Sequence, residues 1–185
     1  MSTSYFRLRT SVVIALFAVL WAMPMWGADR YTGFELSADE QHLTLFQGKR
    51  HVAAPQTETD QAGFSAVKIS ADGRMVGWLV LEPNCCTSYA IPLGLVIVRH
   101  GKVLRQFSAI PPVWDWAFAQ HGRAVVYRQR TLHGSSSVLY TLARLSDGHT
   151  LTRYSCFSEG PQPDPRKVPA WVWPIADECP ERAPQ

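Results

Sequence analysis

The chain has 185 residues, of which 46% are hydrophobic and 18% are charged, and its formal net charge is +3. This composition excludes a disordered, highly charged chain, and the four cysteines are too few for a small domain built on disulfides alone. The small net charge gives no reason to expect a nucleic-acid partner, and the length predicts one domain or two at most.

The first 28 residues have the parts of a secretory signal peptide. Arg7 and Arg9 form a short basic region, and residues 11–26 are almost wholly apolar. We expect cleavage after Ala28, with Ala22 as the alternative site, and an uncleaved membrane anchor is the second interpretation. The protein is therefore predicted to be exported, to the periplasm or the extracellular side. It would meet a membrane only through this segment, if the segment is not cleaved.

Residues 29–158 are predicted to form an antiparallel, all-β domain built from hairpins. After residue 30, short runs rich in β-branched and aromatic residues recur between turn signals, and no 3.6-residue apolar pattern is sustained. Asp-Gly or His-Gly stands at four of the turns, as tight hairpins favour. The expected strands are 43–46, 51–54, 67–69, 75–81, 93–98, 103–107, 114–118, 124–127, 138–145 and 150–154.

An internal repeat divides the β-domain into two units, about 64–108 and 114–155. Gly-Arg-x-Val-x-aromatic recurs at a shift of 49 residues, and a second similarity recurs at a shift of 47. Each unit is predicted to hold about four strands, and Ser37 to Asp39 with the strand and turn that follow are predicted to be a partial copy. The matching segments are 69–78 with 118–127, and 101–108 with 148–155.

The segment Ser70–Val76, with the sequence SADGRMV, resembles the hairpin of WD40-like and TolB-type β-propeller blades. The resemblance covers residues 64–155 and implies four-stranded blades. Two full units and one partial unit are too few to close a propeller, so we expect a sandwich, a stacked meander or an incomplete propeller. Trp78, the loop 83–89 and the segment Trp114–Trp116 are also similar to uncharacterised secreted bacterial proteins, a resemblance that implies no function.

Residues 159–185 form a proline-rich tail. Residues 161–185 hold seven of the 13 prolines, so this segment is predicted to be extended or irregular rather than a central strand. Trp171, Val172, Trp173 and Ile175 are too apolar for a free tail, and we expect Trp171 and Trp173 to dock on the β-domain. The alternative is that they form a motif for a partner.

Cys85, Cys86, Cys156 and Cys179 are the candidates for disulfides, because an exported protein with four cysteines favours two bridges. Three pairings are possible. Two of them tie the tail to the β-domain, and the third joins the adjacent residues Cys85 and Cys86 in a strained, easily reduced bridge. A redox or soft-metal role for Cys85-Cys86 is the alternative interpretation. The chain has no Cys-x-x-Cys motif, and no second close Cys or His pair that would favour zinc.

Trp78, Trp114 and Trp116 are the candidates for an aromatic binding surface. On a strand, Trp114 and Trp116 would share one face, where stacking suits sugar rings or proline-rich peptides. The alternative is that these side chains fill the core between sheets. Of the six histidines, His100, His121 and His149 are expected at turns and His133 in a polar loop. No pair of carboxylates, nucleophile motif or cofactor loop is found.

These patterns favour an exported, non-catalytic β-rich protein that binds a protein or an envelope polymer. No catalytic residue, cofactor, metal or nucleic-acid partner is predicted. The alternative is a redox or metal-handling envelope protein that uses Cys85 and Cys86.

Overall fold

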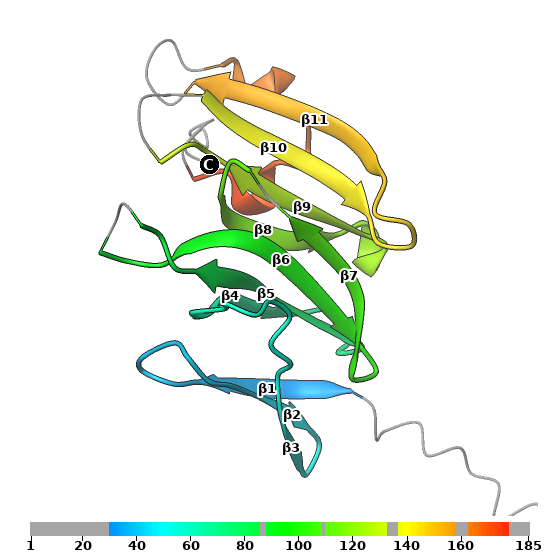
Figure 1. The fold of residues 1–185 in the computed structure, drawn as a ribbon. Coiled ribbons are helices and arrows are strands. Elements are labelled where there is room, and N and C mark those ends of the chain that lie inside the picture. Colours follow the sequence, from blue (N-terminus) through cyan, green and yellow to red (C-terminus); the bar gives the residue numbers. More distant parts are fainter. Residues whose placement is uncertain (1–29, 86–87, 109, 133–136, 158–162, 178–185) are drawn as a thin grey trace, which may run out of the picture.

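The computed structural model describes residues 30–85, 88–108, 110–132, 137–157 and 163–177. The predicted signal peptide and the cysteines Cys86 and Cys179 lie outside these residues. The described chain consists of three antiparallel sheets stacked one on another (Figure 1). Within these ranges, no helix is long and apolar enough to cross a membrane.

The first sheet has three strands, and the second and third have four each. Strand order follows the chain in every sheet, so each sheet is a meander of hairpins. The first sheet contains β1 (Tyr31–Leu36), β2 (Leu43–Gln47) and β3 (Arg50–Ala53). The second contains β4 (Gly63–Ile69), β5 (Met75–Glu82), β6 (Ile91–Arg99) and β7 (Lys102–Ser108), and the third contains β8 (Val113–Ala119), β9 (Ala124–Gln129), β10 (Ser137–Arg144) and β11 (Thr150–Phe157).

The predicted all-β, antiparallel fold with four-stranded units is confirmed, and every expected strand is present. The strands form separate meanders and a closed barrel is absent from the described sheets. β1 was not among the expected strands. Its third residue, Gly33, weakens the strand pattern of the sequence. In the structure, the ring of Phe46 on β2 covers Gly33, and Phe46 Cδ2 lies 3.1 Å from the position that a Cβ atom would take.

The Ser-x-Asp turn that carries the blade resemblance occurs twice with the same hydrogen bonds. Ser70 Oγ donates to Asp72 Oδ1 (2.7 Å) and accepts from the Met75 N–H (2.9 Å). In the first sheet, Ser37 Oγ donates to Asp39 Oδ1 (2.5 Å) and accepts from the His42 N–H (2.9 Å). The serine hydroxyl therefore holds the backbone five residues later in both copies.

The equivalent turn of the third sheet is formed by residues with positive φ rather than by serine and aspartate side chains. Gln120, His121 and Gly122 all have positive φ, and they form the short 3-10 helix η1 (Gln120–Gly122) between β8 and β9. The predicted His-Gly turn is present here, but four residues, 120–123, separate the paired Ala119 and Ala124, so the turn is two residues longer than a two-residue hairpin. No serine or aspartate is needed to close it.

Three apolar clusters fill the spaces between layers. Alternate residues of β5 face opposite neighbours: Val76, Trp78 and Val80 pack toward the first sheet, and Met75 and Leu79 pack toward the third. The second sheet is therefore buried on both faces, which explains its continuous apolar strands. The third cluster lies between the third sheet and the tail.

The tail forms a fourth layer on the outer face of the third sheet. Its two short 3-10 helices are η2 (Pro165–Lys167) and η3 (Trp173–Ile175). Val168, Val172 and Ile175 are buried against the sheet, whereas Trp171 and Trp173 are only partly buried. Figure 1 places the tail at one end of the stack and β1–β3 at the other.

Candidate functional site

Two of the four candidate disulfide cysteines, Cys85 and Cys156, lie among the described residues. Cys85 is exposed in the loop between β5 and β6, and Cys156 is buried on β11 in the cluster that the tail covers. These two cysteines are not bonded to each other. Because Cys86 and Cys179 lie outside the described residues, the pairing stays a prediction.

The proposed aromatic surface is corrected by the burial of two of its three members. Trp78 and Trp116 are 0% exposed and lie in different clusters, on opposite sides of the second sheet. They fill the core, which is the alternative stated for them. A bulge between Val113 and Asp115 also breaks the alternation of β8, so the expected shared face of Trp114 and Trp116 does not follow from their spacing.

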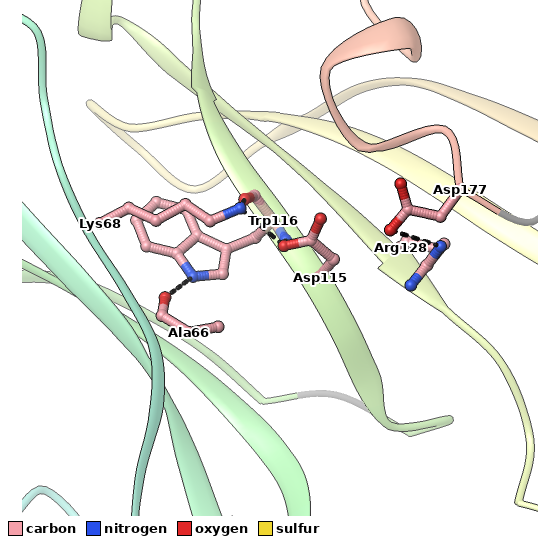
Figure 2. Close-up of polar contacts among 6 residues, drawn as sticks. All are labelled: Ala66, Lys68, Asp115, Trp116, Arg128 and Asp177. Carbon is pink, nitrogen blue, oxygen red and sulfur yellow. Dashed lines mark hydrogen bonds and ion pairs between the residues drawn. The ribbon is translucent and has the colours of Figure 1, made fainter. Parts of the chain in front are cut away.

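Trp116 is the centre of a polar junction between the second and third sheets (Figure 2). Its indole Nε1 donates to the carbonyl of Ala66 (2.8 Å). Lys68 Nζ donates to Asp115 Oδ1 (2.6 Å) and to the carbonyl of Trp116, and it lies 5.8 Å from the Trp116 ring centroid. Ala66 lies in the bulge of β4, where it has φ +47°, and Lys68 is the first paired residue after the bulge. This cluster satisfies polar groups at a sheet interface and is structural.

A second polar contact ties the tail to β9. Arg128 is 7% exposed, and its Nη1 lies 3.5 Å from Asp177 Oδ2, as Figure 2 shows. Asp177 is largely exposed. The ion pair places the end of the described tail beside the third sheet.

Several titrating groups have pKa values that neighbouring hydrogen bonds or burial shift. Hydrogen bonds from the Ser70 hydroxyl and the Arg74 N–H hold the pKa of Asp72 below its usual value, and the Ser37 hydroxyl and Gln41 N–H do the same for Asp39. Burial raises the pKa of Tyr127. Over the ranges that the structure covers, no three His, Cys, Asp or Glu side chains are grouped as a metal site requires.

A pocket of about 180 Å³ lies between the first and second sheets, beside β3. Arg50 and Val52 line it from β3, Tyr31 and Gln47 from the neighbouring strands, and Val98 and His100 from the end of β6 and its turn. The backbone N–H of Gly101 donates to the Tyr31 hydroxyl (3.1 Å), which fixes the turn against the first sheet. None of the residues lining this pocket is acidic.

The outer edge of β3 is open. Gln47 pairs with Arg50 and Leu45 with Val52, and the N–H of Ala54 donates to the Leu43 carbonyl (2.8 Å). Because hydrogen-bonded pairs alternate in an antiparallel ladder, the backbone groups of His51 and Ala53 point away from β2. No described strand pairs with this edge. All four residues of β3 are exposed.

None of these residues was predicted from the sequence to belong to a binding site. The local signal was the basic run Lys49-Arg50-His51 after the Gly48 turn, which reads equally well as a solvated hairpin. His100 was expected only as a turn residue, and the structure places it in the pocket wall. The pocket depends on contacts between segments about fifty residues apart, which no local pattern reveals.

No protein-family model matches the chain, and no curated protein is significantly similar to it. Among solved structures, the chain is similar to a structure of hydrazine synthase from Kuenenia stuttgartiensis, with 14% sequence identity and a TM-score of 0.47. That likeness covers 71% of this chain and 36% of the other. This chain therefore spans little more than a third of that structure, and a likeness at this level carries no argument about function.

Proposed function

We propose that this protein is an exported, non-catalytic module that binds a protein or an envelope polymer at the β3 end of the sheet stack. The observation that carries the proposal is the open edge of β3 beside a pocket that holds Arg50 and His100. The other end of the stack is covered by the tail, so the two ends differ in what they offer to a partner. The export part rests on the N-terminal sequence pattern.

Two other edge strands help to define what is particular about β3. On β7, Arg105 Nε donates to the Leu145 carbonyl (3.1 Å), and Gln106 donates to Glu58, so side chains of this strand already contact neighbouring segments. β11 has an exposed edge as well, but it is the fourth strand of a complete meander. β3 differs from both of these strands. Its edge is exposed, its sheet has one described strand fewer than the other two sheets, and a pocket adjoins it.

Site-specific photo-crosslinking in the producing cells tests this proposal. A photoreactive residue at Val52, which is 36% exposed, should give a discrete adduct in the exported fraction. The matched control is the same residue at Thr152, an exposed position on β11. Adducts of equal yield from both positions, or none from Val52, would contradict the proposal. The intact mass of the same material tests export, because a chain that begins near Asp29 is expected.

The proposal includes a covalent staple that holds the tail. Cys156 is buried beneath the tail, and Asp177, two residues before Cys179, is bound to Arg128. These positions support a bridge from Cys156 to Cys179. Peptide mapping without reduction should recover Cys156 in a disulfide-linked pair, and recovery of Cys156 only as an alkylated thiol would overturn this part.

A further inference from the structure

The first sheet is one strand short of its two neighbours. β1–β3 form a three-stranded meander, whereas β4–β7 and β8–β11 each have four strands in the same order. The position of a fourth strand beside β3 is therefore empty among the described residues. His51 and Ala53 direct their N–H and C=O groups to that position. An extended backbone is the ligand that such a row of donors and acceptors fits.

The pocket beside this edge selects side-chain chemistry. Alternation along β3 sends Arg50 and Val52 to the pocket side and His51 to the outer face, where its ring stacks on Phe46 with centroids 4.6 Å apart. Residues of an added strand that pair opposite Arg50 or Val52 share their face. Such residues would meet the Arg50 guanidinium, with His100 across the pocket, and no lining carboxylate. A carboxylate is the group that this arrangement favours.

Charge also decides between a foreign strand and a second copy of this chain. Pairing β3 with β3 of another copy would bring together two basic runs, each containing Lys49, Arg50 and His51. Like charges facing across a strand pair are unfavourable, and basic residues on an edge commonly oppose self-association. The charges of an acidic partner strand would instead be opposite to those of Lys49 and Arg50.

We infer that the partner is an extended peptide segment with acidic side chains, which adds to β3 as a fourth strand and places a carboxylate in the Arg50–His100 pocket. This inference rests on the proposed function and names the partner class for the same site. The backbone of the segment supplies pairing to His51 and Ala53, and its alternate side chains supply specificity.

The test uses the full exported chain and three synthetic octapeptides, measured by titration calorimetry. The first is Ac-TVEVTVET-NH2, the second carries lysine in place of both glutamates, and the third carries the same glutamates with N-methylated amides on one edge. The first peptide should bind, and the other two should bind at least about tenfold more weakly. Equal binding of the N-methylated peptide would show that the site holds an anionic chain without strand addition, and equal binding of the lysine peptide would remove the acidic preference; either result overturns the inference.

Charge reversal on the protein keeps the test independent of peptide behaviour. Arg50→Glu should lose affinity for the glutamate peptide and gain it for the lysine peptide, and the gain shows that the variant is folded. Arg153→Glu, on the exposed part of β11, is the matched control and should change neither affinity. Equal effects of the two variants would refute the site. A photo-adduct at Val52 without peptide binding would overturn this inference alone, whereas the absence of both would overturn the proposed function too.

Discussion

Replacing Trp116 with phenylalanine should destabilise the protein more than the same change at Trp78. Both side chains are 0% exposed, so the two variants lose the same buried atoms. The lost packing alone should lower the free energy of unfolding of each variant by about 1–2 kcal/mol. They differ in hydrogen bonding. Trp116 Nε1 donates to the Ala66 carbonyl at 2.8 Å, whereas Trp78 Nε1 is buried with no hydrogen-bond partner among the described residues.

The difference between the two variants can be estimated from these contacts. Loss of the bond to Ala66 removes about 1 kcal/mol. The lost bond also anchors the backbone of Ala66, which has φ +47°. The contact of Lys68 with the ring weakens too, which costs less than about 1 kcal/mol. Trp116→Phe should therefore be less stable than Trp78→Phe by about 1–2 kcal/mol, or about 2–8 °C in melting temperature for a chain of this size.

Thermal unfolding followed by far-UV circular dichroism measures this difference without relying on tryptophan emission. A wild-type protein and the two single variants, purified with the same N-terminus, are sufficient. Equal melting temperatures for the two variants, or a lower one for Trp78→Phe, would refute the role assigned to the junction between the second and third sheets.

Three further predictions concern the turns and the sheet interface. Gly77→Ala should destabilise by about 1–3 kcal/mol in urea unfolding, because the new Cβ would lie 2.5 Å from an Ile97 methyl group and 2.8 Å from the Trp116 ring; unchanged stability would refute the close packing of the sheets. Ser70→Ala should lower the unfolding free energy by about 1–3 kcal/mol because Ser70 is 5% exposed and its loss leaves the Met75 N–H unpaired, whereas the more exposed Ser37→Ala should lower it by less; the reverse order would contradict the burial argument. Because the pKa of Asp72 is lower in the folded chain, its contribution to stability is present above the ordinary carboxyl pKa near ~3.9 and is lost as pH falls through the folded value. Unfolding curves from pH 6 to pH 2 should show a shallower acid slope for Asp72→Asn, and an unchanged slope would remove this contribution.

The strands and turns followed from local chemistry that the sequence displays directly. The Ser-x-Asp turns work through hydrogen bonds within six residues, so Ser70 and Ser37 could be recognised before any contact was known. β1 could not be recognised in this way, since Gly33 interrupts its pattern and the ring that covers Gly33 comes from β2. Trp171 and Trp173 pack against the third sheet, but they are less buried than other apolar residues of the tail. The small apolar residues Val172 and Ile175 fit against the sheet, and the larger Trp171 and Trp173 only partly enter.

The candidate site could not be predicted because it depends on how the sheets stack. A tryptophan pattern looks the same on a surface and in a core, and only the third dimension places Trp78 and Trp116 inside. Arg50 on β3 and His100 in the β6–β7 turn belong to different sheets and line one pocket only after folding. That no described strand lies beside β3 as a fourth is likewise visible only when the three sheets are compared.

Amide hydrogen exchange at the edge of β3 tests the central claim most directly. In the protein alone, the outward N–H groups of His51 and Ala53 should exchange rapidly, because they have no partner strand among the described residues. Addition of the glutamate octapeptide should slow exchange at these two amides and leave the edge of β11 unchanged. Slowed exchange on β11 instead, or no change at His51 and Ala53 under saturating peptide, would contradict the assignment of β3 as the binding edge.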